Sequence, residues 1–444
     1  MKILTLLLFY LLAFGCSSTD HIINERYLHS ARKIASWLSN TRTDSPRDIW
    51  PDDATDPTVS SFSLSQGIAG KVIFCIELFN ATKDSTYFRM ARDGCDHLIQ
   101  GLSQPDSIFT QKLWAFGPYG DLSGAYQALS IFGKQTADEE CLDAARSYLS
   151  IIERNAQSYG DSISWGPNND IMGGLAGIGL VYIDAFEKFG EANYRNMAES
   201  IARILTARSQ KTEHGQYWYF AQDRPFNLPN FSHGAAGIGF FYARLYEATD
   251  NSEYLHNALS AVEFLNEVAV DTVGDAFLVP YGIPNEGWSS PYEIGWAHGP
   301  AGTARLFQQL FKVTGDKIWL DKMKACAAAI DLAPFGIANP IFGQSTVSVD
   351  RRFGLGGVVH FLLDMHALTS DEIYLTKAQG TLDYMLKQSI HDNQGMYWEV
   401  SKGDQRTIPT GYFYGSAGIG LLCLKMLATS SNKAHPHRLV DDVR

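Results

Sequence analysis

Two kinds of apolar segment alternate along the chain from about residue 24 onward. In the first kind, charged and apolar residues mix, and the apolar positions recur every three or four residues, as on one face of a helix. These amphipathic segments cover residues 27–38, 86–99, 139–152 and 194–207. The second kind is apolar on nearly every side and must be buried all round, as at residues 177–185, 237–248 and 418–428. Outer amphipathic helices that alternate with inner apolar helices predict a closed ring, an all-α fold of the α/α toroid class.

A short motif stands at the start of each apolar segment: a small residue, two further residues, and glycine. It occurs seven times, and its final residues are Gly70, Gly124, Gly177, Gly237, Gly302, Gly357 and Gly418. Successive copies lie 53 to 65 residues apart, which predicts one domain of seven helical hairpins over residues 24–429. Glycine allows close backbone approach at these helix starts. We expect unbonded N–H groups there to attract an anion or a polar ligand.

The segments between and after the helices carry weaker signals. Aromatic runs at residues 217–220 and 396–400 predict short strands in the loops. Residues 270–295 form a helix-poor insertion rich in Pro, Gly and Trp, and we expect it to cover part of one rim of the ring. Residues 430–444 are polar, and we expect them to form a frayed C-terminal tail.

The first residues have the pattern of an export signal. Lys2 precedes an apolar run over residues 3–14, and Gly15 and Cys16 follow it. The run is too short to span a bilayer as a stable helix. We expect residues 1–15 to be a signal peptide and Cys16 to become a lipidated first residue, which predicts an extracytoplasmic lipoprotein of a bacterial cell envelope. The alternative is an ordinary signal peptide in which Cys16 is incidental.

Charge and cysteine content exclude several classes of protein. The formal net charge is −12, from 36 basic and 48 acidic residues, so the chain has no basic excess with which to neutralise phosphates. Six cysteines in 444 residues are too few for a disulfide scaffold, and none lies in a Cys-x-x-Cys pair. We therefore expect no nucleic-acid partner, and contact with a membrane only through the lipid anchor.

Three of the motif-bearing segments indicate a family. They are residues 170–177 (Asp-Ile-Met-Gly-Gly-Leu-Ala-Gly), residues 232–237 (Ser-His-Gly-Ala-Ala-Gly) and residues 411–422. Together with the seven repeats, they resemble the lanthionine synthetase C-like (LanC-like) proteins over nearly the whole mature chain. The resemblance implies an α/α toroid of seven hairpins, a functional aspartate at Asp170 and a catalytic histidine at His233. Cyclases of this family add a cysteine thiol of a peptide to a dehydroalanine or dehydrobutyrine.

The zinc site that the resemblance implies is substituted in this chain. Family cyclases hold zinc with two cysteines and one histidine, and the metal lowers the pKa of the substrate thiol. The corresponding positions here are Ala297, Arg352 and Phe353. Alanine and phenylalanine offer no ligand, and an arginine cation repels the metal. We therefore expect no zinc cofactor, and an export signal also separates the chain from the cytoplasm, where peptide cyclisation would be expected.

Two residues at matching family positions keep the capacity for acid–base chemistry. Asp170 and His233 can serve together as general acid and base, or they can be retained to bond the loop backbone. His298 is adjacent to a lost zinc position and is a candidate ligand-binding residue. With His233, it is also the basis of an alternative in which a metal is bound at a relocated site.

Positive charge replaces metal ligands in the sixth repeat. Arg351 and Arg352 at a rim with unbonded helix N–H groups favour a carboxylate, sulfate, phosphate or enolate oxygen. The alternative is a solvated pair matched to Asp350. Asp121 replaces a motif glycine in the second repeat; it either caps its helix or pairs with Asp170 as a second carboxylate.

Aromatic residues crowd the predicted rim, where they can stack on sugar rings or pack the rim itself; they are Trp114, Tyr119, Trp165, Trp288, Trp296, Tyr412 and Tyr414. Three functions stay open. The first is a zinc-less LanC-like protein that binds a peptide or small anionic ligand in the mouth of the toroid. The second is a carbohydrate-active hydrolase or lyase with two acidic groups. The third is a thiol-adding cyclase with relocated zinc. The first requires the fewest new functional residues.

Overall fold

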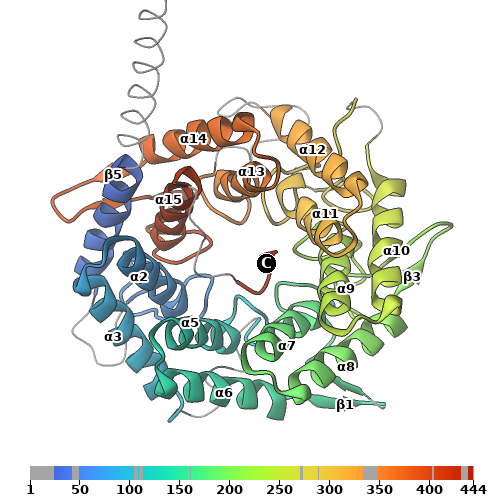
Figure 1. Ribbon diagram of the computed structural model, residues 1–444, viewed down its shortest axis with the longest axis horizontal. Coiled ribbons are helices and arrows are strands. Elements are labelled where there is room, and N and C mark those ends of the chain that lie inside the picture. Colours follow the sequence, from blue (N-terminus) through green and yellow to red (C-terminus); the bar gives the residue numbers. More distant parts are fainter. Residues whose placement is uncertain are drawn as a thin grey trace, which may run out of the picture.

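The computed structural model describes residues 25–42, 50–104, 109, 114–160, 162–270, 274–288, 290–333, 348–402, 405–431 and 439–443. Within these residues, fourteen helices form seven hairpins arranged as two concentric rings (Figure 1). The α/α toroid is therefore confirmed. The expected signal peptide over residues 1–15 and the lipidation site Cys16 lie outside the described residues. Among the helices that are described, none is long and apolar enough to cross a bilayer.

The inner ring consists of the apolar helices that follow the glycine motifs. They are α2 (Ile68–Thr82), α5 (Asp121–Thr136), α7 (Leu175–Phe189), α9 (Ala235–Thr249), α11 (Pro300–Thr314), α13 (Leu355–Thr369) and α15 (Ser416–Ser430). Helix α15 packs against α2, which closes the ring. The first ten or so residues of each inner helix are buried throughout, as helices that are apolar on most sides require.

The outer ring consists of the amphipathic helices. They are residues 25–40, α3 (Ser85–Gly101), α6 (Glu139–Arg154), α8 (Ala192–Arg208), α10 (Ser252–Val268), α12 (Lys317–Asp331) and α14 (Glu372–Lys387). Side-chain caps begin several of them: Asp84, Asp138, Asn251, Asp316 and Asp371 each accept a backbone N–H of the first turn.

Short antiparallel strand pairs lie in the loops at the ring's outer edge. They are β1 (Gln157–Tyr159) with β2 (Ser162–Ser164), β3 (Gln210–Lys211) with β4 (Gln216–Tyr217), β5 (Ile390–His391) with β6 (Met396–Tyr397), and β7 (Val400–Lys402) with β8 (Gln405–Thr407). The strands predicted at the aromatic runs are present in β4, β6 and β7, although they are shorter than the runs.

The loops that lead into the inner helices share one backbone geometry. A loop carbonyl accepts the N–H group seven residues further on: Asn168 from Leu175 at 3.1 Å and Asn169 from Ala176 at 3.2 Å, with the same spacing before α15. The first-turn N–H groups of these helices are thus already bonded by their own loops. The expectation that they are unbonded and attract a ligand was wrong for α7 and α15, because each loop folds back over its helix start.

A belt of backbone hydrogen bonds joins the seven loops to one another at this end of the ring, which we call the mouth. The links are Ser65 N–H to Tyr119 O, Phe413 to Ser65, Arg351 to Phe413, Ala297 to Arg352, Ser232 to Ala297 and Ile171 to Ser232, at 2.7–3.2 Å. Every donor and acceptor lies two or three residues before a glycine motif. The belt therefore fixes, repeat by repeat, which side chains reach the mouth.

The C-terminal segment differs from expectation. Residues 439–443, which we call the tail plug, lie in the centre of the ring (Figure 1), and Leu439 and Val440 are each only 1% exposed. The expectation of a frayed tail was wrong for these five residues. The sequence of the tail alone does not indicate this burial, because it depends on Arg305 of inner helix α11, which pairs with the carboxylates of both Asp441 and Asp442.

The close approach of loop and helix predicts that the last glycine of a motif cannot be enlarged. A Cβ on Gly302 would lie 1.8 Å from the Trp296 carbonyl oxygen, whereas a Cβ on Gly380, in outer helix α14, would meet nothing within 4 Å. We expect Gly302→Ala to lower the free energy of unfolding by about 2–3 kcal/mol. The same change at Gly380 should raise it by up to about 1 kcal/mol, since alanine favours a helix. Urea unfolding of both variants measures the difference, and equal effects would contradict the packing described here.

Candidate functional site

Side chains before each glycine motif alternate between the mouth and the space enclosed by the inner helices, which we call the lumen. The residues directly before the motif glycine of four successive repeats are His233, His298, Phe353 and Tyr414. Their ring centroids are 5.3, 6.2 and 6.4 Å apart in that order, so they form an arc at the mouth. The residues two positions earlier are Phe231, Trp296, Arg351 and Tyr412, which contact one another or the lumen. Extended backbone produces this alternation.

Asp170 and His233, predicted as a pair, are in direct contact. His233 Nδ1 lies 2.5 Å from Asp170 Oδ2, and Asp170 Oδ1 accepts the Gly173 N–H at 3.2 Å. Asp170 is fully buried, whereas the His233 side chain keeps 10% of its surface exposed. The carboxylate fixes the Nδ1 tautomer and leaves Nε2 as the nitrogen available to a ligand. The Phe220 ring meets the imidazole edge-on at 5.0 Å and limits its movement.

His298 lies beside His233 in a nearly closed environment. It is 1% exposed, and Tyr281 stacks on its ring at 4.0 Å. Burial, together with the charges of His233 and Arg352, holds the pKa of His298 well below its usual range, so it is neutral near pH 7. Its Nδ1 is buried and has no hydrogen-bond partner. A neutral imidazole with an unused nitrogen is prepared to bond a ligand or a water molecule.

Arg352 is the cation of the mouth. Its guanidinium lies 5.2 Å from the Trp114 ring, 4.5 Å from the Phe353 ring and 6.0 Å from the Tyr414 ring, and Nη1 donates to the Tyr414 hydroxyl at 2.5 Å. The residue is 8% exposed, its Nε has no hydrogen-bond partner, and no ion pair joins it to a carboxylate among the described residues. Aromatic faces stabilise the cation in part, but its charge stays without a carboxylate.

Two residues that sequence reasoning did not single out also belong to the site. Glu293 and Tyr281 come from the helix-poor insertion, and Glu293 is 7% exposed with its Oε2 unpartnered. Burial and the charge of Asp350 raise the pKa of Glu293 to about 7, although Arg352 acts in the opposite direction. Burial and the Glu293 charge also raise the pKa of Tyr281. The only sequence signal was their place in an insertion expected to cover the rim.

Other predicted site residues point elsewhere. Trp296 is 3% exposed, and its Nε1 donates to Asp441 of the tail plug at 3.1 Å, so it faces the lumen. Arg351 contacts His360 and the Tyr412 ring, also in the lumen. Both arginines are buried, so the alternative of a solvated pair matched to Asp350 was wrong.

Asp121 lies in the first turn of α5 and is 4% exposed. Its Oδ1 accepts the Phe62 N–H at 2.8 Å, which ties the loop before α2 to α5. Asp170 is instead bonded by His233 and Gly173. The structure thus gives the two carboxylates different partners and brings Asp170, His233, His298, Arg352 and Tyr414 together at the mouth.

The rim aromatics divide in the same way. Trp114 contacts Arg352, and the Trp288 ring packs at a tilt against Tyr281 with ring centroids 4.8 Å apart, so both belong to the mouth. Tyr119 and Tyr412 are buried in the lumen layer against Phe413. Trp165 donates to the Ile152 carbonyl of outer helix α6 and serves packing.

The family model for lanthionine synthetase C-like proteins matches residues 58–439. The chain belongs to the lanthionine synthetase C-like family. No curated protein sequence matches it.

Solved structures agree with this LanC-like fold. A nisin cyclase structure matches with a TM-score of 0.60 at 16% identity, over 91% of this chain and 98% of that chain. The Lin0763 protein from Listeria innocua matches with a TM-score of 0.54 at 16% identity, over 93% and 99%. An alpha-1,6-mannanase from Salegentibacter sp. HEL1_6 matches with a TM-score of 0.50 at 13% identity, over 91% and 99%. At these identities the likeness shows the fold alone.

The residues of this LanC-like chain do not fit the zinc that its family implies. Ala297 contributes its backbone to the belt, Arg352 brings a cation to the position, and Phe353 presents a ring. Nowhere in the part of the chain that is described do three or more His, Cys, Asp or Glu side chains gather in a way that could hold a metal ion. His233 and His298 adjoin each other but lack a third ligand, so the described residues provide no relocated site either.

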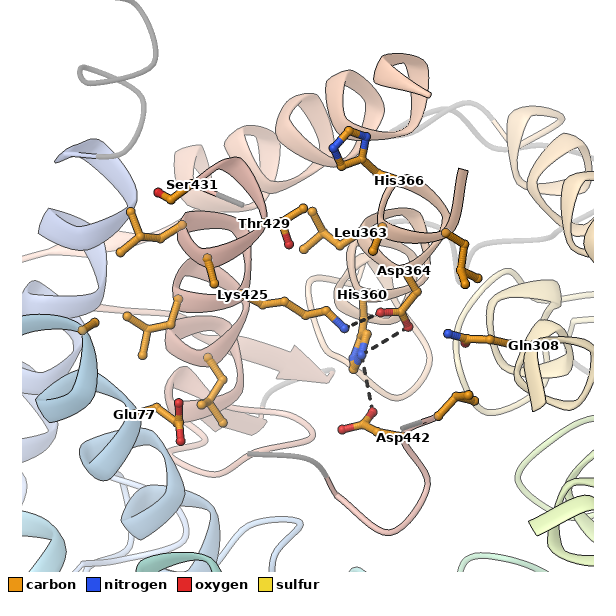
Figure 2. A pocket seen from close by; sticks show the side chains of 18 of the residues that line it. Glu77, Gln308, His360, Leu363, Asp364, His366, Lys425, Thr429, Ser431 and Asp442 are labelled. Atoms are coloured by element: carbon orange, nitrogen blue, oxygen red, sulfur yellow. Dashed lines mark hydrogen bonds and ion pairs between the residues drawn. The ribbon is translucent and has the colours of Figure 1, made fainter. Parts of the chain in front are cut away.

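A large cavity extends from the lumen toward the end of the ring opposite the mouth. It has a volume of about 940 Å³ and is lined mainly by the C-terminal halves of α2, α11, α13 and α15, and at the lumen by Arg351 and Tyr412 (Figure 2). Lys425 and Asp364 meet there at 2.5 Å, and His360 lies 3.5 Å from Asp364. We call it the distal cavity. The sequence signal for this cavity was the presence of the charged residues Lys425 and Asp364 inside otherwise apolar inner helices.

The raised pKa of Glu293 predicts a pH dependence of stability. Between its ordinary pKa of 4.5 and about 7, the native chain holds a proton that the unfolded chain has lost. Stability therefore falls as pH rises through this window, by about 3 kcal/mol in total. We expect Glu293→Gln to remove this component in urea unfolding at pH 5, 6, 7 and 8.

Glu286→Gln is the matched control, because Glu286 lies in the same insertion but is exposed. The control should keep the pH dependence of the unaltered chain. An unchanged pH profile in Glu293→Gln would show that the Glu293 carboxyl is not held protonated at the mouth.

Proposed function

We propose that this LanC-like protein binds a peptide or small molecule through an anionic group at the mouth of the ring. The observation that carries the proposal is Arg352, a buried guanidinium without a carboxylate partner among the described residues. A buried charge that lacks a counter-charge destabilises a protein by several kcal/mol, on the order of 3–5 when a partner is removed. A ligand carboxylate, phosphate or sulfate would relieve that cost.

The neighbouring unpartnered atoms support the same location for a ligand. Three buried atoms have no hydrogen-bond partner: Glu293 Oε2, His298 Nδ1 and Arg352 Nε. They lie close enough together that the charge of Arg352 acts on the pKa values of both Glu293 and His298. Native proteins leave few such groups without a reason. A planar guanidinium that can offer two parallel N–H groups suits a carboxylate particularly well.

The mouth also retains groups that can move a proton. His233 Nε2, held in position through the Asp170 bond, is a candidate base. Glu293, with a pKa of about 7, is a candidate acid at neutral pH. Any residual chemistry is therefore proton transfer on a bound anionic ligand. Thiol addition through zinc is disfavoured, because the three positions that would hold the metal carry Ala297, Arg352 and Phe353.

A second candidate function is glycan hydrolysis or cleavage. The observation that favours it is the cluster of Trp288, Tyr281 and His298, in which Tyr281 stacks on His298 and Trp288 packs at a tilt against Tyr281, since aromatic faces beside carboxyl groups suit sugar rings. Turnover of a glycan that is abolished by Asp170→Asn would support this candidate over a binding role.

Arg352 provides the test of the anion-binding proposal. We expect phosphate, sulfate or a tripeptide with a free C-terminal carboxylate to raise the melting temperature of the intact protein saturably. Arg352→Ala should abolish the response, and His233→Ala should weaken it about tenfold, which is the loss of roughly one hydrogen bond to a charged group. Circular dichroism confirms that the variants fold.

Arg89→Ala is the control, since Arg89 is exposed on outer helix α3 and bonds only to residues of its own helix. It should respond like the intact chain. Equal responses of Arg352→Ala and the intact chain to every probe would refute the mouth as an anion site.

We further propose that the protein is exported and anchored to a bacterial envelope membrane by lipid at Cys16. The basic start, short apolar run and following cysteine support this. When the chain is expressed with its own first residues in a bacterium that processes lipoproteins, it should incorporate an alkyne-labelled palmitate. Cys16→Ser should abolish the label, whereas Cys75→Ser, which alters a buried core cysteine, should not. Labelling that persists in Cys16→Ser would contradict the anchor.

A further inference from the structure

The tail plug is held in the lumen mainly by its acidic and main-chain groups. Arg305 Nη1 lies 3.2 Å from a carboxylate oxygen of Asp441 and 3.2 Å from one of Asp442. Trp296 Nε1 donates to Asp441, and Arg244 Nη1 donates to the main-chain oxygen of Asp442 at 3.1 Å. These donors come from the loop before α11 and from the inner helices α9 and α11, so the plug bridges separate repeats.

The plug also buries two apolar side chains and a backbone N–H group. Leu439 and Val440 are almost completely buried, and the Val440 N–H donates to Gln127 of α5 at 3.4 Å. A simple inorganic anion would use none of these contacts. The lumen thus holds a short segment folded as a turn, in which the Asp442 N–H donates to the Leu439 carbonyl oxygen at 3.1 Å, with two apolar residues followed by two carboxylates.

Cations dominate the side chains that face these carboxylates. Burial alone would raise the pKa of Asp442, but the charges of Arg305, Lys425 and Arg351 outweigh burial and hold it well below its usual range. Arg305 is 5% exposed and Arg351 is 8% exposed. Withdrawal of the plug would leave both arginines buried without these two carboxylates, a state that strongly favours replacement by another anion.

Space for a longer segment adjoins the plug. Asp442 and Val443 line the distal cavity, and Figure 2 shows Asp442 pointing toward His360 at its inner end, 3.5 Å away. The cavity's 940 Å³ opens beyond them along the apolar side chains of α13 and α15.

We propose that the lumen of the ring is a binding site for acidic peptide segments, which Asp441 and Asp442 fill in cis and which an acidic segment of another polypeptide can occupy in their place. The site is separate from the anion site proposed at the mouth, since it uses Arg305 and Arg351 rather than Arg352. The chain's own tail is then an intramolecular competitor, and its tether gives it a high effective concentration.

The test uses an acetylated hexapeptide with the sequence of residues 439–444 and a second hexapeptide in which asparagine replaces both aspartates. The full-length chain carrying Asp441→Asn and Asp442→Asn should bind the acidic peptide saturably in isothermal titration calorimetry. The unaltered chain should bind it at least tenfold more weakly, because its own tail competes. Neither chain should bind the asparagine peptide measurably.

A chain that ends at Arg438 gives a second measurement. It should bind the acidic peptide, and addition of Arg305→Gln should abolish that binding, whereas Arg203→Gln, at an exposed position of outer helix α8, should not. If removal of the plug unfolds the ring, the acidic peptide should restore the thermal transition and the asparagine peptide should not.

Equal binding of the two peptides would overturn the proposal. It would also be overturned if the acidic peptide neither bound to the two altered chains nor restored their thermal transition. Arg352→Ala leaves the lumen contacts in place, so its effect on the binding of phosphate, sulfate or the tripeptide tests the mouth alone. The hexapeptides test the lumen. Failure of one site can therefore be distinguished from failure of the other.

Discussion

The structure depends on the belt of backbone hydrogen bonds that joins the loops at the mouth. Inner helices that are apolar on most sides could pack in many relative positions, since apolar contact is not directional. The belt removes this freedom, because each loop donates to or accepts from the next one at 2.7–3.2 Å. The motif glycines make it possible: at Gly302, a side chain would collide with the Trp296 carbonyl oxygen. The belt then sets the alternation that sends His298 to the mouth and Trp296 to the lumen.

The same scaffold carries different chemistry when side chains on the belt change. At the positions where the family holds zinc, this chain places Ala297, Arg352 and Phe353. Positive charge is thus retained, but as a fixed guanidinium in an aromatic surrounding. A guanidinium binds an oxyanion well, yet it offers no empty coordination position on which a thiolate could form. The proposed change of ligand class at the mouth follows from these substitutions, while Asp170 and His233 are in contact.

The two ends of the ring have different properties, and the tail plug lies between them. The mouth is a set of small, buried, partly unpartnered groups around Arg352. The distal cavity has a volume of about 940 Å³ and is lined by leucines together with Lys425, Asp364 and His360. Trp296 connects these regions, because its backbone lies next to the belt while its indole bonds Asp441. A change in the plug would therefore act directly on a residue whose neighbours, Ala297 and His298, form part of the mouth.

The sequence by itself determined the toroid, the seven repeats and the family, and the resemblance to that family also offered Asp170 and His233 as a pair. The toroid and the repeats follow from local rules, since helical periodicity and motif spacing are properties of neighbouring residues. Only the tertiary structure decided that first-turn N–H groups are bonded by their own loops, that Arg351 and Arg352 point to opposite sides, and that Glu293 joins the site. It also decided that residues 439–443 lie inside the ring. Each of these depends on which groups from distant repeats meet in space: Asp441 and Asp442 are acidic surface residues by composition, and they are interior residues because Arg305, more than 130 positions earlier in the chain, lies opposite them.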